Sequence, residues 1–178
     1  KSVSNFQENK IRNMLLIDEK LRCASLSLLE RLPEYPLSNL FVQEVALLID
    51  TFPMKVTNIL LKFVNLSLQG AQFLLRRTDL WMNPLRNETV PFSFNLFLAV
   101  FKYPEVRGRL IEAPEFPNLM LCVIKLREKT LFEAVSLIFK RVKIDEAIVD
   151  ALENAGFYAE LAKICNQYCK DSCRPDQN

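Results

Sequence analysis

Apolar residues recur along most of the chain at three- and four-residue spacing, which is the period of an amphipathic helix. The pattern is dense in residues 60–85, LLKFVNLSLQGAQFLLRRTDLWMNPL, where one of only three glycines, Gly70, interrupts it. No segment shows the alternation of apolar and polar residues that a half-buried strand requires. The pattern therefore predicts an all-α fold. The low glycine content also argues against a fold with many tight β-turns.

Prolines, glycines and small polar residues predict where the helices begin and end. Gly70 is expected to end one helix, and Gly156 to precede the last one. The residues expected at the starts of other helices are Ser38, Pro53, Asp79, Pro91, Thr130 and Asp145. We expect about ten helices, over residues 6–32, 38–49, 53–70, 71–77, from 79 onward, 91–103, 105–112, 114–126, 130–142, 144–153 and 157–169.

Three pieces of the chain resemble one another: FLLRRTDLWMNPL (73–85), RLIEAPEFPNLML (109–121) and VDALENAGFYAEL (149–161). Each reads as a short helix, a polar break, an aromatic residue and an aliphatic segment. The aromatic residues, Trp81, Phe116 and Phe157, are 35 and 41 residues apart, and an apolar helix precedes each piece. We expect Trp81, Phe157 and Tyr158 to lie in the core rather than on a binding surface. A period of this length is typical of helical repeats, in which neighbouring units share a continuous core.

The pattern resembles armadillo repeats over roughly residues 54–170. The segments that carry the resemblance are LLKFVNLSLQGAQFLL and AIVDALENAGFYAELAKI. It implies a superhelical solenoid of about three to four repeats, forming a single domain over 1–170 with N-terminal helices or a cap over 1–52, repeats over 53–170 and a flexible tail over 171–178. HEAT repeats and a helical bundle without repeats are the alternatives.

In the armadillo family the third helices of the repeats line a groove that holds extended peptides. Asn65 matches the family position whose side-chain amide bonds the backbone of the peptide. The chain departs from the family pattern at Leu61, where a tryptophan is usual, and at Val100 and Arg141, where further asparagines would stand. The resemblance therefore implies groove binding without an asparagine ladder.

Charge is unevenly distributed along the chain. Residues 76–143 carry 12 basic and 7 acidic side chains, whereas residues 144–178 carry 3 basic and 7 acidic ones. Stacked repeats would align two basic groups into a stripe: Lys102, Arg107 and Arg109, and Lys140, Arg141 and Lys143. We expect Asn65, Lys102, Lys140 and Arg141 to bind a peptide or helical segment of a protein partner. Solvated helix faces are the simpler interpretation of the charges, and a HEAT-like module that binds nucleic acid is the alternative function.

The residue types argue against catalysis. Histidine is absent, and no phosphate-binding loop, dinucleotide fingerprint or metalloprotease motif occurs, so we expect neither an enzyme nor a cofactor or small-molecule site. Cys165, Cys169 and Cys173 recur every four residues, but three thiols on one helix make an incomplete zinc site. We therefore expect no bound metal.

The remaining features concern compartment and assembly. The longest uncharged apolar run, residues 90–101, has 12 residues, fewer than the roughly 20 that span a bilayer. The odd number of cysteines, five, favours a reducing compartment: cytoplasm, nucleus or centrosome. Because the chain begins with Lys1, we expect it to be part of a larger intracellular scaffold, in which it acts as a protein–protein interaction module. Self-association through an exposed end of the solenoid is a further alternative.

Overall fold

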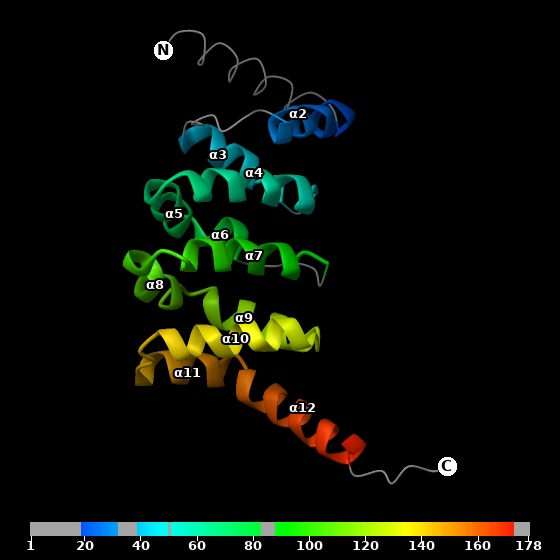
Figure 1. The fold of residues 1–178 in the computed structure, drawn as a ribbon, viewed down its shortest axis with the longest axis vertical. Helices are drawn as coiled ribbons and strands as arrows, with labels where there is room; N and C mark the ends of the chain where they lie inside the picture. Colours follow the sequence, from blue (N-terminus) through cyan, green and yellow to red (C-terminus); the bar gives the residue numbers. More distant parts are fainter. Residues whose placement is uncertain (1–18, 32–38, 50, 83–87, 173–178) are drawn as a thin grey trace, which may run out of the picture. The chain divides into compact units, whose positions relative to one another are not determined.

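The computed structural model describes residues 19–31, 39–49, 51–82 and 88–172, and every regular element in these ranges is a helix (Figure 1). The all-α prediction is therefore confirmed for this part of the chain. The chain divides into two compact units, Lys1–Arg107 and Gly108–Asn178. Each unit is described by itself, and the expectation of a single domain stays a prediction. No helix within the described ranges is long and apolar enough to cross a membrane.

The helices of the first unit are α2 (Glu19–Arg31), α3 (Asn39–Ala46), α4 (Pro53–Leu66), α5 (Leu68–Leu75), α6 (Thr78–Trp81) and α7 (Val90–Phe101). Helix α8 (Pro104–Ile111) contains the boundary between the units. The second unit continues with α9 (Phe116–Lys125), α10 (Lys129–Arg141), α11 (Glu146–Asn154) and α12 (Phe157–Ser172). Three predicted features lie outside the described residues: the first part of the first helix (6–18), the helix start at Ser38 and most of the tail (173–178). The predicted start of the tail is wrong, because Asp171 and Ser172 belong to α12.

Proline lies in the first turn of four of these helices. These prolines are Pro53 in α4, Pro91 in α7, Pro104 in α8 and Pro117 in α9. The first turn is where proline fits, because the backbone N–H groups there have no partner within the helix and its fixed φ is already helical. The predictions at Pro53 and Pro91 are therefore confirmed.

The prediction that Gly70 ends a helix is wrong. Helix α4 already ends at Leu66, and the extended residue Ser67 separates it from α5. The Ser67 hydroxyl accepts a hydrogen bond from the backbone N–H of Gly70 at 3.3 Å and so caps α5. Gly70 lies inside α5, where a Cβ would come within 2.5 Å of the Phe63 carbonyl oxygen. Glycine is needed here because α5 approaches the backbone of α4 closely.

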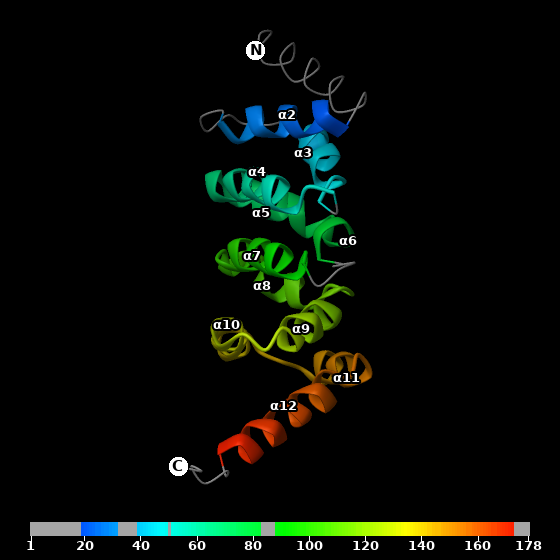
Figure 2. The ribbon, with the colours of Figure 1, turned by 90° about the vertical axis from the view of Figure 1, so that its right-hand side faces the viewer.

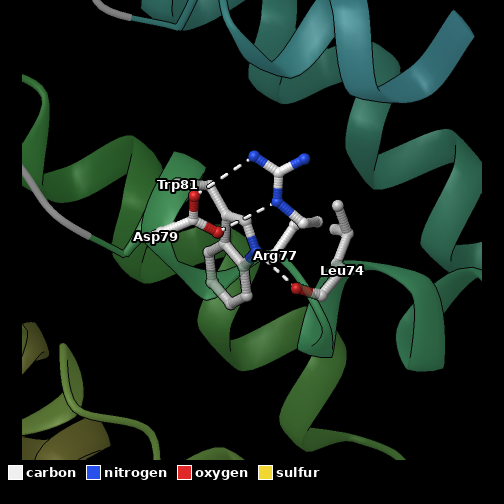
Figure 3. Close-up of polar contacts among 4 residues, drawn as sticks. All are labelled: Leu74, Arg77, Asp79 and Trp81. Carbon is white, nitrogen blue, oxygen red and sulfur yellow. Dashed lines mark hydrogen bonds and ion pairs between the residues drawn. The ribbon is translucent and has the colours of Figure 1, made fainter. Parts of the chain in front are cut away.

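Two predicted caps are also wrong. Helix α6 begins at Thr78, and Asp79 lies inside it, with its carboxylate paired at 3.1 Å to the Arg77 guanidinium rather than to a backbone N–H (Figure 3). Thr130 lies inside α10, which begins at Lys129.

Three further helix boundaries were predicted near the C-terminus and after Ser38. The Asp145 cap is confirmed, because its Oδ1 accepts from the Ile148 N–H at 3.0 Å. Gly156, with φ +84°, precedes α12 as expected. Helix α3 ends at Ala46, so Leu48 and Ile49 lie in a turn rather than in the predicted helix.

Helix α4 is the centre of the first unit. It packs against α2, α3, α5 and α7, and α5 also contacts α7 (Figures 1 and 2). The core of this unit includes aliphatic residues of α4 and phenylalanines of α7: Val56, Leu60, Val64, Phe94 and Phe97. The Tyr103 hydroxyl donates to the Val64 carbonyl oxygen at 2.8 Å, which joins the end of α7 to the end of α4.

Trp81 is fully buried in the first unit (Figure 3). Its indole Nε1–H donates to the Leu74 carbonyl oxygen at 2.9 Å, which satisfies the one polar atom of the side chain and a carbonyl in the last turn of α5. The indole thus holds α6 against the end of α5. The sequence indicated a core role for this residue, and that interpretation is confirmed.

Helix α9 is the centre of the second unit, where it packs against α10, α11 and α12. Its buried face consists of Phe116, Leu119, Met120, Val123 and Ile124. Edge-to-face ring contacts then run from Phe116 through Phe139 to Phe157 and Tyr158, with centroids 6.4, 5.8 and 5.5 Å apart. Phe157 is buried as predicted, whereas the same prediction for Tyr158 is wrong, because 39% of its surface is exposed.

Candidate partner-binding face

Two of the predicted partner-binding residues lie in the first unit and are close to each other. Asn65 lies in the last turn of α4 and Lys102 directly follows α7, and both side chains are exposed. The hydrogen bond from Tyr103 to Val64 joins the residues next to them. The structure therefore brings Asn65 and Lys102 to the same end of two neighbouring helices.

The other two predicted residues, Lys140 and Arg141, lie in the second unit. They form the last turn of α10, and both side chains are exposed. The four residues thus form two pairs, one in each unit, and a groove shared by the two pairs stays a prediction.

Leu137 adds an apolar side chain to the second pair. It precedes Lys140 and Arg141 by three and four residues, so the three side chains share one face of the helix. Leu137 has 51% of its surface exposed, although it lies between two buried residues of the same helix, Val135 and Ile138. We call Leu137, Lys140 and Arg141 the α10 face.

In the sequence, Leu137 belongs to the apolar run of α10 together with Val135 and Ile138. At about 100° per residue, Leu137 points about 200° around the helix from Val135, which lies on the buried side. This angular position indicates that Leu137 and Val135 face different sides of the helix. Only the packing of α10 on α9 establishes which side is covered.

The α10 face is basic. Neither Lys140 nor Arg141 forms an ion pair within the described residues, and Lys143, which follows the helix, is also exposed and unpaired there. Both cations lie at the C-terminal end of α10, where a helix dipole contributes about half a negative charge. Two full positive charges exceed that half charge, so the face remains positive.

Arg107 was expected to contribute to a basic stripe, but its guanidinium is used within the first unit. Its Nε donates to the Phe101 carbonyl oxygen at 2.7 Å and its Nη2 to the Lys102 carbonyl oxygen at 3.2 Å. The guanidinium also lies 5.2 Å from the centroid of the Phe101 ring. Arg107 therefore caps the carbonyl end of α7. Lys102 is exposed in the same unit, and Arg109, which belongs to the second unit, is also exposed.

The cysteines lie apart from the α10 face. Cys165 and Cys169 are exposed on α12, Cys23 and Cys122 are half-buried, and Cys173 lies outside the described residues. In the described part of the chain, no group of three or more potential metal-ligating residues comes together. Burial raises the pKa of the Cys122 thiol above its ordinary value, and the nearby Lys125 opposes this shift in part.

Comparisons with known proteins identify no family. No family model matches the chain, and no curated protein or solved structure is significantly similar to it.

Proposed function

We propose that the chain is a non-catalytic protein–protein interaction module of a larger intracellular scaffold, and that its α10 face binds an acidic amphipathic segment of a partner. The observation that carries this proposal is the exposed Leu137 beside two cations without ion pairs among the described residues. A helix with leucine and glutamate at three- and four-residue spacing offers the complementary chemistry. Its leucine would cover Leu137, and its carboxylates would meet Lys140 and Arg141.

The strength of such binding can be bounded from its parts. Exposed ion pairs contribute about 0.2–1 kcal/mol each, and covering the exposed half of a leucine contributes about 1 kcal/mol. These contributions support only weak binding by the α10 face alone, because a millimolar dissociation constant already corresponds to about 4 kcal/mol. We infer that a natural partner also contacts further surface, and Asn65 and Lys102 are the residues proposed for it.

We propose an armadillo-like stacking of helices as the architecture that presents this surface. Trp81, Phe116 and Phe157 support it, because these three residues of the sequence repeat are all buried. Helices α4 and α7 support it as well: they pack together, and the hydrogen bond between Tyr103 and Val64 joins their carboxyl ends, as expected of equivalent helices in successive repeats.

Nucleic acid is the competing partner for a basic face. Single strands bind through aromatic side chains on which bases stack, but Phe97, Phe101 and Phe116 are buried in this structure. These three phenylalanines therefore have no exposed ring on which a base could stack, which favours the protein partner. A nucleic-acid partner also predicts a steep loss of affinity with salt, because each phosphate contact releases counterions.

The proposal can be tested with a fluorescein-labelled amphipathic peptide that carries leucine and glutamate on one face. Fluorescence anisotropy would measure its dissociation constant for the chain and for the double variant Lys140→Glu, Arg141→Glu. Reversing both charges replaces two attractions by two repulsions, so we expect affinity to fall about tenfold. Leu137→Ser should also weaken binding of the peptide. It changes no charge, so the dependence of the affinity on salt should stay nearly the same.

The matched control is Arg76→Glu combined with Lys125→Glu. These exposed cations also lie at the carboxyl ends of helices, α5 and α9, so the control loses the same compensation of helix dipoles. Affinity equal to that of the unchanged chain is expected for the control. Equal losses in both double variants would contradict the proposal, and tighter binding of a single-stranded oligonucleotide than of the peptide would favour the nucleic-acid function.

A further inference from the structure

A groove in the second unit shares no lining residue with the α10 face, and its charged lining residues are acidic. It has a volume of about 240 Å³ and is formed by the segment after α8, the start of α9 and the first half of α11. Its apolar lining includes Ala113, Pro117, Ile148 and Ala151. The volume is below the roughly 300–1,000 Å³ of small-molecule sites. It suits a single side chain of a protein partner better than a small molecule.

Two exposed carboxylates, Glu112 and Asp145, line the groove. Asp145 uses Oδ1 to cap α11, and neither residue forms an ion pair within the described part of the chain. A third acidic residue, Glu115, stands in sequence between two lining prolines. Its Oε2 is buried and has no hydrogen-bond partner among the described residues. Glu115 does not itself line the groove, so Glu112 and Asp145 are the carboxylates that a ligand in the groove would meet.

The charge balance of this region determines which ligand it attracts. Helices α9 and α11 both begin here, and each helix start contributes about half a positive charge. The two carboxylates that line the groove, Glu112 and Asp145, carry two formal negative charges, which exceed the helix contribution by about one. The groove is therefore cation-attracting despite the two helix starts, and an anionic ligand is disfavoured.

We propose that this groove binds an arginine side chain of a protein partner. The methylene groups of the arginine would lie on the apolar lining, as the stems of long cationic side chains do on apolar surfaces. The guanidinium would donate to Glu112 and Asp145, which come from separate elements. Five donors in a fixed planar arrangement allow arginine to serve two carboxylates at once, whereas the ammonium of lysine is a strongly hydrated point charge. This site is independent of the α10 face, so either can be correct without the other.

The test is a titration of the full chain with acetyl-arginine amide, followed by NMR of the backbone amides and methyl groups. We expect saturable shifts at Ala147, Ile148 and Ala151, with a dissociation constant of about 1 mM or weaker, because a single side chain provides few contacts. Acetyl-citrulline amide has nearly the same shape without the charge, and it should cause no saturable shift at these residues. Acetyl-lysine amide should bind more weakly than the arginine derivative.

Two variants remove charge with little effect on the fold. Asp145→Asn keeps the cap of α11, because asparagine caps helices as well as aspartate does, and Glu112→Gln changes an exposed side chain. Each should weaken binding of acetyl-arginine amide at least about threefold, since a charge-assisted hydrogen bond becomes a neutral one. Glu153→Gln, on α11 but outside the groove lining, is the control and should leave affinity unchanged. Equal binding of acetyl-citrulline amide, or unchanged affinity in a variant that combines Glu112→Gln with Asp145→Asn, would overturn the proposal.

Discussion

At the residue scale, Gly70 and Gly108 show that two glycines within helices can have opposite roles. A Cβ on Gly70 would meet the Phe63 carbonyl oxygen at 2.5 Å and the Phe63 carbonyl carbon at 3.1 Å, whereas a Cβ on Gly108 would meet no atom within 4 Å. The sequence shows that Gly70 interrupts an apolar helical pattern, but it does not show which structural role requires glycine there. Ending a helix and allowing a close approach both select glycine, and only the neighbouring helix in space distinguishes them.

Alanine substitution should separate the two glycines. Gly70→Ala is expected to lower the free energy of unfolding by about 1–3 kcal/mol, because α5 must move away from α4 to admit the methyl group. Gly108→Ala should raise it by about 0.5–1 kcal/mol, since alanine is the better helix former and has room. Urea denaturation followed by circular dichroism measures both. A Gly70→Ala variant as stable as Gly108→Ala would show that the contact with Phe63 is absent.

Cys122 should react differently from the exposed cysteines. Burial holds its pKa above the ordinary value, so at mildly alkaline pH it has less of the thiolate that alkylating reagents attack. We expect iodoacetamide to modify Cys165 and Cys169 several times faster than Cys122, as measured by peptide mass spectrometry. The difference should disappear in urea. Equal rates in the folded chain would contradict the half-buried position of Cys122.

The raised pKa also fixes the sign of a pH effect on stability. The neutral thiol of Cys122 is favoured in the folded state, so its contribution is fully present below the pKa of the unfolded chain. It is lost as pH rises through the higher pKa of the folded chain. A Cys122→Ser variant should therefore show a smaller loss of stability at alkaline pH than the unchanged chain.

At the element scale, the sequence predicted the helix starts that a single residue determines. It did not predict those at which a side chain can either cap the helix or pair with a neighbouring charge. Pro53 and Pro91 open their helices because the restriction lies in the proline ring itself. Asp79 and Asp145 have the same side chain, but only Asp145 caps a helix, since the Asp79 carboxylate is paired with Arg77. The sequence shows Arg77 two residues before Asp79, but it does not show that the guanidinium lies close enough to pair with the carboxylate.

The cap at Asp145 gives a prediction for α11. Asp145→Ala should lower the free energy of unfolding by about 1 kcal/mol, because the Ile148 N–H loses its acceptor. Asp145→Asn should change it by no more than a few tenths of a kcal/mol, since its amide oxygen accepts the same bond. Thermal denaturation of the two variants provides the comparison. Equal losses in both would mean that the charge of Asp145, rather than the cap, stabilises α11.

At the scale of the whole molecule, the sequence predicted the helical content and the exposure of its four candidate residues, but not their grouping. Lys140 and Arg141 are exposed as expected. Asn65 and Lys102 lie at the same end of α4 and α7, because the hydrogen bond from Tyr103 to Val64 joins the residues next to them. Leu137 was missed because the apolar period of α10 does not say which neighbour covers which side. The acidic groove was missed because Glu112 and Asp145 are 33 positions apart and meet only through the packing of α9 on α11.

The most direct test of the central claim is a charge-swap binding cycle on the α10 face. Anisotropy would compare the chain and its Lys140→Glu, Arg141→Glu variant, each titrated with an amphipathic peptide carrying leucine with glutamate or leucine with lysine. We predict that the unchanged chain prefers the glutamate peptide and that the variant prefers the lysine peptide, each by about tenfold. A variant that loses the glutamate peptide without gaining the lysine peptide, or a chain that binds both peptides equally, would contradict an interaction through this face.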